Sequence, residues 1–184
     1  MKKIILPLFV IVIACACGSS DDSKKVANED NKEKFDSTDI QDDTKFAVTA
    51  AEGGMLEVEL AKLALTNASS PVIQNFAKMM IDDHSKAGEE LKTLAAQKNI
   101  TLPNVLSNQH QDDYSELAKK KGADFDKAYA SYMVKDHKED IHAFTKQAEK
   151  GKDAELKNWA AGKIPVLQHH LDKAQTADST VHPL

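Results

Sequence analysis

The sequence predicts an all-α protein, a bundle of four long antiparallel helices. Three observations support this prediction. Between residues 44 and 177, apolar residues recur every three or four positions, which is the period of an amphipathic helix. No stretch alternates between apolar and polar residues for long enough to suggest a sheet. Pro71, Pro103 and Gly151 stand at the breaks between the periodic segments.

The four periodic segments predict helices over residues 44–67, 71–98, 124–150 and 153–177. The second begins with a favourable cap and a first-turn proline at Ser70-Pro71. Gly151 ends the third. Pro165 is expected to kink the fourth, because it removes one backbone donor.

The connections between these segments predict the topology. The first and third connections are tight, so each joins an antiparallel hairpin. The connection over residues 99–122 is far longer than a turn needs, and a short helix is expected at 107–120. A link of this length can return along the bundle and make the second and third helices parallel, which is the ferritin-like arrangement. A weak internal repeat aligns residues 76–84 with 129–137, with Met, Asp and His matched.

The N-terminus predicts export and lipid anchoring. Lys2 and Lys3 precede an apolar run at residues 4–14 that is too short to remain as a membrane span. A small residue precedes Cys17, as in a lipobox, so residues 1–17 are interpreted as a lipoprotein signal peptide. Cys15 is the alternative lipidation site, and ordinary secretion is a further alternative. The predicted location is the cell envelope, with a lipid anchor in the outer membrane facing the periplasm or the cell surface.

Composition limits the remaining chain. Residues 18–43 are polar and are expected to form a disordered tether, the bundle is expected over 44–177, and residues 178–184 are expected to be a disordered tail. The only cysteines are Cys15 and Cys17, so the bundle has no disulfide and no thiolate ligand. All 24 basic residues are lysines, against 29 acidic residues, which makes nucleic acid an improbable partner. The membrane, reached through the N-terminal lipid, is the expected partner.

Each predicted long helix carries one ionisable residue in step with its apolar positions. These residues are Glu57, His84, His137 and His170. At a rise of about 1.5 Å per residue, all four can reach one height inside the bundle.

A carboxylate and neutral imidazoles are suitable ligands for one transition-metal ion, Zn, Fe, Mn or Cu. Asp83 or Asp136 could orient a ring N–H from outside such a site. The alternative is a non-enzymatic structural or stress-related interaction lipoprotein, in which the same residues form a metal-free hydrogen-bonded network.

Other candidates are weaker. Glu139 and His142 match a Glu-x-x-His motif, but His142 lies about 140° around the helix from His137 and is expected to face solvent. His169 is expected at the rim, and the methionines are expected in the core. Gly53-Gly54 is expected to allow close helix packing. No nucleophilic triad, phosphate loop or dinucleotide fingerprint is present, so a binding role is favoured over catalysis.

The ordered segments resemble a known family. They are Ala50-Ala51-Glu52-Gly53-Gly54 with Glu57, Phe76-Ala77 with Asp83-His84, Phe125-Asp126 with His137, and Pro165 with His169-His170-Leu171. Together they resemble a bacterial family of exported, ferritin-like proteins that is catalogued as a domain of unknown function and often labelled putative outer-membrane proteins. The resemblance implies a ferritin-like bundle in the envelope and selects the same four residues, Glu57, His84, His137 and His170. It does not imply ferroxidase activity.

Overall fold

The structure, a computed structural model, describes residues 22–182 and consists there of six helices with no strand. The predicted signal peptide and both cysteines lie outside the described residues. The helices are α1 (Ser23–Lys34), α2 (Gln41–Asn67), α3 (Pro71–Gln97), α4 (Asn108–Ala118), α5 (Gly122–Lys150) and α6 (Ala154–Val181). The prediction of an all-helical fold is therefore confirmed for the described part of the chain.

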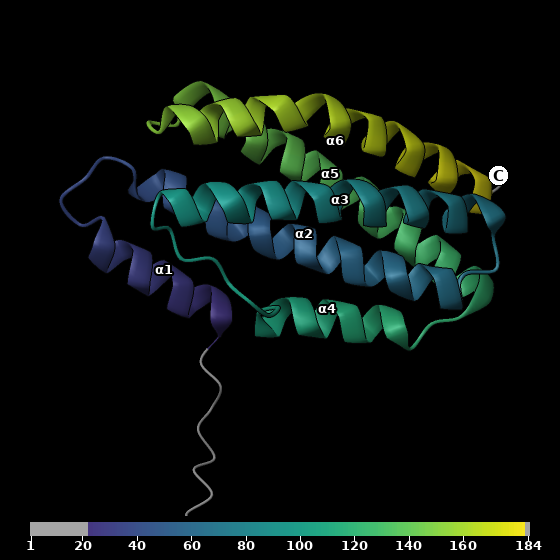
Figure 1. Ribbon diagram of the computed structural model, residues 1–184. Coiled ribbons are helices and arrows are strands. Elements are labelled where there is room, and N and C mark those ends of the chain that lie inside the picture. Colours follow the sequence, from purple (N-terminus) through teal and green to yellow (C-terminus); the bar gives the residue numbers. More distant parts are fainter. Residues whose placement is uncertain (1–21, 183–184) are drawn as a thin grey trace, which may run out of the picture.

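The four long helices pack as two hairpins, α2 with α3 and α5 with α6 (Figure 1). The segment between α3 and α5 returns along the outside of α2 and carries α4, which contacts α2 and α5. As a result α3 and α5 run in the same direction, as the length of the connection predicted. α6 continues through Pro165 as one helix.

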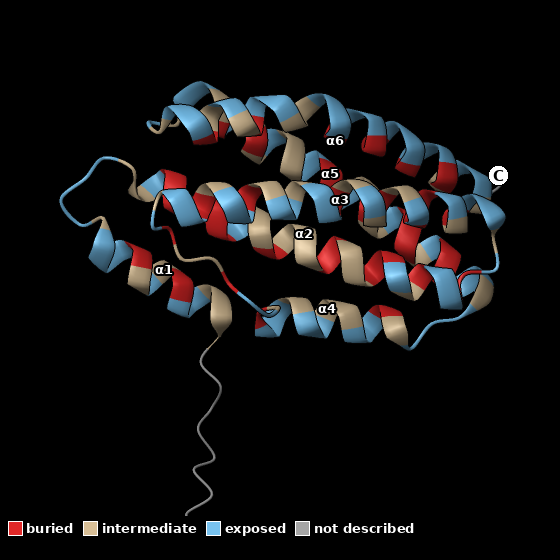
Figure 2. Ribbon diagram, in the orientation of Figure 1, coloured by how far each residue is buried: buried red, intermediate tan, exposed pale blue. Residues whose placement is uncertain are grey.

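Buried residues face the space between the four long helices (Figure 2). The largest apolar cluster fills the end of the bundle near the α2–α3 turn and includes Leu60, Ile73, Met80, Phe125 and Tyr129. A second cluster around Leu91 and Leu156 and a third around Phe144 and Leu167 fill the opposite end. Burial of apolar surface is the main force that holds the helices together.

Buried carboxylates fix the two tight turns. Asp126 of α5 accepts hydrogen bonds from the backbone N–H groups of Ser69 and Ser70, at 3.1 and 3.0 Å, where α3 begins. Asp43 of α2 accepts from the backbone N–H groups of Lys152 and Asp153, at 2.9 and 3.1 Å, where α6 begins. These backbone N–H groups have no partner within their own helix, so each carboxylate satisfies donors at a helix start.

The prediction of a disordered tether over residues 18–43 is wrong for α1 and for the start of α2. Asn31 of α1 is buried, donates to the carbonyl of Thr101 and accepts from its backbone N–H, both at 2.8 Å. α1 thus docks through polar contacts on the segment between α3 and α5, here called the crossover. Because α1 has few apolar residues, its sequence did not predict this docking. The predicted tail is also shorter than expected, because α6 extends to Val181.

The internal repeat has a structural counterpart. The rings of Phe76 and Tyr129, which the repeat aligns, lie 6.0 Å apart between centroids, and those of His84 and His137 lie 5.8 Å apart. Met80 and Met133, also aligned, are both fully buried in one cluster. Equivalent residues meet because α3 and α5 run parallel and hold them at the same height.

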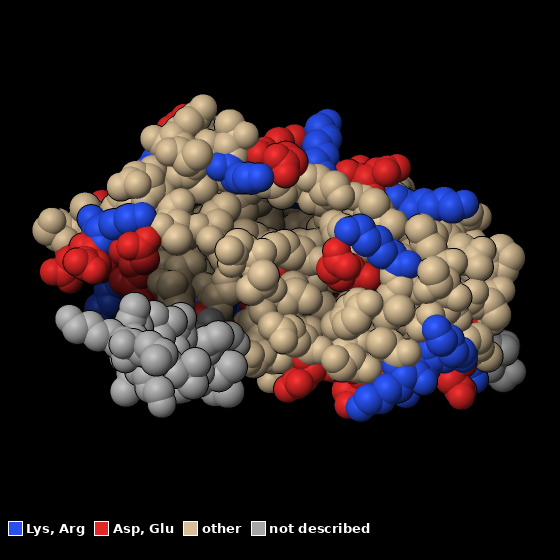
Figure 3. Space-filling model, turned by 60° about the horizontal axis from the view of Figure 1, so that its bottom comes forward, with Lys and Arg blue, Asp and Glu red and all other residues tan. Residues whose placement is uncertain are grey.

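The described part of the chain carries its own core. The three apolar clusters are built from residues within 22–182, which gives this part a core of its own. Lysine and acidic side chains are interspersed on the face that carries α1 and α4 (Figure 3). None of the six described helices is long and apolar enough to cross a bilayer.

Candidate metal centre

Four long helices each contribute one ionisable residue to a buried cluster at mid-height. Glu57 comes from α2, His84 from α3, His137 from α5 and His170 from α6. All four are at most 8 % exposed. The structure thus brings together the four residues selected from the sequence, because each lies on the apolar stripe of its own helix and the stripes share one interior.

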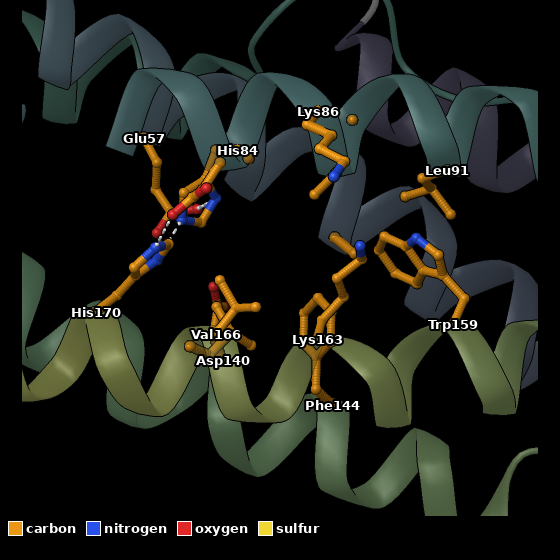
Figure 4. A pocket seen from close by; sticks show the side chains of 16 residues that line it. Glu57, His84, Lys86, Leu91, Asp140, Phe144, Trp159, Lys163, Val166 and His170 are labelled. Atoms are coloured by element: carbon orange, nitrogen blue, oxygen red, sulfur yellow. Dashed lines mark hydrogen bonds and ion pairs between the residues drawn. The ribbon is translucent and has the colours of Figure 1, made fainter. Parts of the chain in front are cut away.

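The four side chains are in direct contact. Glu57 Oε2 lies 2.7 Å from His84 Nδ1, and Glu57 Oε1 lies 3.5 Å from His137 Nε2. His84 Nε2 lies 3.1 Å from His170 Nδ1. Figure 4 shows Glu57, His84 and His170 converging from three helices.

Each histidine also has one ring nitrogen next to an oxygen acceptor. His137 Nδ1 donates to the carbonyl of Met133, in the preceding turn of α5, at 2.9 Å. His170 Nε2 faces Asp83 Oδ2 at 2.9 Å, which is the outer-shell role predicted for Asp83. His84 Nδ1 faces Glu57 in the same way.

These contacts set the direction of the remaining lone pairs. A carbonyl oxygen can only accept, so His137 carries its proton on Nδ1 and its Nε2 presents a lone pair. If ionised Asp83 and Glu57 accept the ring protons of the other two histidines, His170 Nδ1 and His84 Nε2 present lone pairs too. One nitrogen from each of the three histidines lies within 4.8 Å of the other two. This is the orientation of imidazoles by hydrogen-bond acceptors that metal sites use.

The spacing suits a small cation. Two imidazole nitrogens bound to one Zn²⁺ at about 2.0–2.1 Å in tetrahedral geometry lie about 3.3 Å apart. His84 Nε2 and His170 Nδ1 are 3.1 Å apart. The third nitrogen, His137 Nε2, is buried and has no hydrogen-bond partner among the described residues, and neither has Glu57 Oε1. These two atoms lie 3.5 Å from each other, and five other buried side-chain atoms of the described residues also lack a hydrogen-bond partner, so the convergence of the three histidine nitrogens is the stronger indication of an ion.

Burial keeps the cluster in the protonation states that metal binding requires of histidine. It lowers the pKa of His84 to about 4 and that of His137 to about 3. The pKa of His170 is also lowered, chiefly by burial. The three imidazoles are therefore neutral at pH 7 and available as ligands. Burial, followed by the charge of Asp140, raises the pKa of Glu57 well above its usual value.

Glu57 could serve either as a metal ligand or as a hydrogen-bond partner that orients a ligand. Its Oε2 orients His84, whereas Oε1 belongs to a second group of possible ligand atoms formed with Asp136 and His137. Asp136 was expected outside the site as a partner for a ring N–H. It lies instead next to Glu57, and burial followed by the charge of Glu57 raises its pKa well above the usual value.

Two groups near the cluster were missed. Asp140, for which no prediction was made from the sequence, lines the same cavity as Glu57, and burial raises its pKa to about 7. Its spacing of three residues from His137, about 60° around the helix, was the available signal. Glu52 is fully buried and forms a separate cluster with Lys24 and His110.

Of the predictions for the weaker candidates, some are confirmed and one is wrong. Glu139, His142 and His169 are exposed, as expected. Met80 and Met133 are core residues, also as expected. The expectation that Gly53 and Gly54 allow close helix packing is wrong, because a Cβ atom at either position meets nothing within 4 Å.

Two hollows adjoin the cluster. One is a cavity of about 130 Å³ between α2, α3, α5 and α6, with Glu57, His84 and His170 in its wall. The other is a groove of about 830 Å³ between α2, α3 and the crossover. Gly54, His84 and Gly88 line both. The absence of side chains at Gly54 and Gly88 leaves the space beside His84 open.

The fold and the site together define a class: an all-helical protein with a buried cluster of three histidines and a glutamate that could hold a metal ion. The chain belongs to the family described as a domain of unknown function, DUF4142, which it matches over residues 28–177. This match begins within α1 and ends within α6. No curated protein and no solved structure matches the chain significantly.

Proposed function

We propose that this protein is an envelope-anchored helical bundle that binds one transition-metal ion through His84, His137 and His170, with Glu57 as orienting partner or fourth ligand. One observation carries the proposal. Three buried imidazole nitrogens converge while oxygen acceptors hold the opposite ring nitrogens, and His137 Nε2 is left without a partner among the described residues.

The donor set limits the ion. Imidazole nitrogens suit Zn, Cu, Fe and Ni, and a carboxylate oxygen extends the range to Mn. Zn, Fe, Mn and Cu are therefore the ions to test. With three histidines as ligands, one coordination position remains for Glu57 or for a molecule from outside, as in open zinc sites. Binding or sequestration of the ion is the role that this site supports best.

The arrangement of the helices supports a ferritin-like bundle. α3 and α5 run parallel because α4 and its flanking segments return along the bundle, and two hairpins joined by one long crossover define that arrangement. The chemistry differs from that of di-iron members. The one Glu-x-x-His motif, Glu139 to His142, has both residues exposed, so a di-iron ferroxidase centre is not proposed.

The N-terminal sequence supports the envelope location. An apolar run after two lysines ends at Cys17, with Cys15 as the alternative lipidation site. Outer-membrane anchoring remains part of the proposal. Incorporation of labelled palmitate into the wild-type chain, but not into Cys17→Ser, would assign the lipid to Cys17, and retention of the label would move it to Cys15.

A metal-free polar network is the second candidate, and the same contacts allow it. A protonated Glu57 could donate to His84 Nδ1, His84 Nε2 to His170 Nδ1, and His170 Nε2 to Asp83. The raised pKa of Glu57 favours this assignment. It leaves His137 Nε2 with only the 3.5 Å contact to Glu57 Oε1, which does not have hydrogen-bond geometry, and this is why the metal site is the preferred interpretation.

Metal content decides between the two candidates. The chain from Asp22 onward is purified without chelator and examined by mass spectrometry beside His84→Ala/His137→Ala. The matched control, His142→Ala/His169→Ala, removes two exposed histidines instead. We expect about one ion per chain in the wild type and the control and none in the folded cluster variant.

Thermal unfolding provides a second readout. An ion that binds only the native state raises the melting temperature as its concentration rises. Absence of metal from the wild type, together with no shift in melting temperature on adding Zn²⁺, Cu²⁺, Fe²⁺ or Mn²⁺, would reject the metal site and favour the network.

A further inference from the structure

The cavity beside the histidines has two chemically different ends. Leu91, Phe144 and Trp159 give one end apolar side chains, with the ammonium of Lys163 5.9 Å from the centre of the Trp159 ring, and His84, His170 and Asp140 lie toward the other end (Figure 4). The rings of Phe144 and Trp159 lie 5.5 Å apart between centroids at a tilt of 40°. A cavity with this division fits a molecule that is apolar at one end and polar at the other.

The volume limits the size of that molecule. The cavity measures about 130 Å³, and an apolar protein cavity of about 150 Å³ is known to hold one benzene molecule. The space is therefore about that needed by one six-membered ring. Phe144 and Trp159 offer aromatic surfaces, against which a flat ring gains more than an aliphatic group of equal area.

The polar end selects the functional group. Three acidic residues, Glu57, Asp83 and Asp140, line the cavity together with the two histidines, and Lys86 and Lys163 line it as well, so its wall carries both acidic and basic groups. Lys163, the lysine on the α6 side, is already paired with Glu90 of α3. A neutral hydroxyl suits this end, because it can donate to a carboxylate and offer its oxygen lone pairs to a cation.

We propose that this cavity binds a single-ring aromatic molecule bearing a hydroxyl group, with the ring against Phe144 and Trp159 and the oxygen toward His84 and His170. The inference deepens the proposed function, on which the metal contact of the oxygen rests. The position of the ring does not depend on the metal, so the two ideas can fail separately.

The chain contains its own probe and its own matched controls. Trp159 is the only tryptophan and lies in the cavity wall, so its fluorescence reports on occupancy. Gly54→Leu places a side chain into the open space beside His84, whereas Gly53→Leu changes the neighbouring residue, which lines neither hollow. Both replace a helical glycine and should not weaken the helix.

The experiment titrates phenol, and toluene as the isostere without oxygen, into the chain from Asp22 onward and follows Trp159 fluorescence. Phenol and toluene are added to the metal-free protein and to the Co²⁺-loaded protein. We expect saturable binding of phenol in both forms, about tenfold tighter than toluene, which lacks the hydrogen bond. The visible spectrum of the Co²⁺ form should change as phenol saturates, and Gly54→Leu should lose about tenfold in affinity while Gly53→Leu keeps it.

The outcomes separate the two proposals. Failure of the protein to take up Co²⁺ or any other ion rejects the metal site, and saturable phenol binding blocked by Gly54→Leu would still support the aromatic site. Equal affinities for phenol and toluene, or equal effects of the two leucine substitutions, would overturn the inference even in a protein that binds its metal.

Discussion

Two buried carboxylates on helix α2 lie five residues apart and have opposite environments. Glu52 is completely buried, and three donors surround it: Ser107 N at 3.0 Å, His110 Nδ1 at 3.1 Å and Lys24 Nζ at 2.7 Å. These partners overcome the cost of burial and lower the pKa of Glu52 to about 2. Glu52 therefore remains ionised and ties α1 and the start of α4 to the bundle.

Glu57 is equally buried but poorly partnered. Its closest contact is His84 Nδ1 at 2.7 Å, its second oxygen lies 3.5 Å from His137 Nε2 and beside Asp136, and none of these partners is a lysine. The cost of burying its charged form is not offset by its partners, so the pKa of Glu57 rises well above the usual value. Neutral imidazoles surround it instead of cations, and a cation in their midst would supply the missing charge.

The difference separates a structural carboxylate from a functional one. A buried charge that holds a fold together is compensated by opposite charges of its own protein, as Glu52 is by Lys24 and His110. A buried acid that lacks partners beside three convergent histidine nitrogens is satisfied only when something else binds, or when it keeps its proton. The four predictions below test this contrast, and all use the chain from Asp22 onward.

The largest effect is expected from removing the structural carboxylate. Glu52→Ala leaves Lys24 and His110 without their partner and the N–H of Ser107 without its acceptor, which should destabilise the metal-free protein by about 3 kcal/mol. Urea unfolding measures this. Glu57→Ala is the matched substitution, and if it costs more than Glu52→Ala in the absence of metal, the contrast between the two sites is broken.

The decrease of the unfolding free energy at acid pH should depend on Glu52. Its folded pKa, about 2, is below the unfolded value of 4.5, so its contribution is present above pH 4.5 and is lost as pH falls toward 2. The shift corresponds to about 3 kcal/mol. His110 acts in the opposite sense: its pKa is raised by the hydrogen bond to Glu52, so its contribution is complete below pH 6.5 and is lost as pH rises through the folded value.

Unfolding free energies of the wild type and Glu52→Gln across pH 2–7 test this. We expect the difference between the two proteins to be greatest between pH 4.5 and 6.5 and to shrink toward pH 2. The buried histidines destabilise both proteins below pH 6.5, because His84 and His137 have lowered pKa values, and this effect cancels in the difference. A constant difference over the whole range would show that Glu52 is not a buried ionised group.

The contrast also explains what the sequence could reveal. Glu57, His84, His137 and His170 were predictable because each falls in step with the apolar residues of a long helix, and rigid helices of known rise bring such positions to one height. Glu52 lies about 140° around α2 from Glu57 and faces the crossover. The path of that crossover depends on contacts distant in sequence, so neither His110 nor Lys24 could be assigned to it.

The same reasoning applies to the helices themselves. The four long ones have apolar stripes, and their predicted limits agree closely with those observed. α1 has few apolar residues and is held by the polar contacts of Asn31 and Lys24. A helix stabilised by long-range hydrogen bonds leaves no periodic signal, which is why it was taken for part of a tether.

A smaller effect, and one specific to metal, is expected at the functional carboxylate. Glu57→Gln keeps the shape of the side chain but removes the charge that faces His84 Nδ1. Loss of such a partner typically weakens metal binding by about 10–100-fold. Competition with a chelator measures the affinity, and Glu52→Gln is the control. Metal-free stability should change by less than about 1 kcal/mol, so a large loss of stability without loss of metal would assign Glu57 to the structural class.

The smallest effect is expected from the most exposed partner of Glu52. The Lys24 side chain is 34 % exposed, so Lys24→Ala should cost about 1 kcal/mol or less, and the cost should fall at high salt. His110→Ala removes a partner that is less exposed, at 22 %, and should cost more. Urea unfolding at low and high salt, with hydrogen exchange of the α1 amides, separates the two. Faster exchange confined to α1 in Lys24→Ala would show that this ion pair docks the helix. Equal losses of unfolding free energy in Lys24→Ala and His110→Ala would contradict the prediction that the more buried partner of Glu52 contributes more to stability.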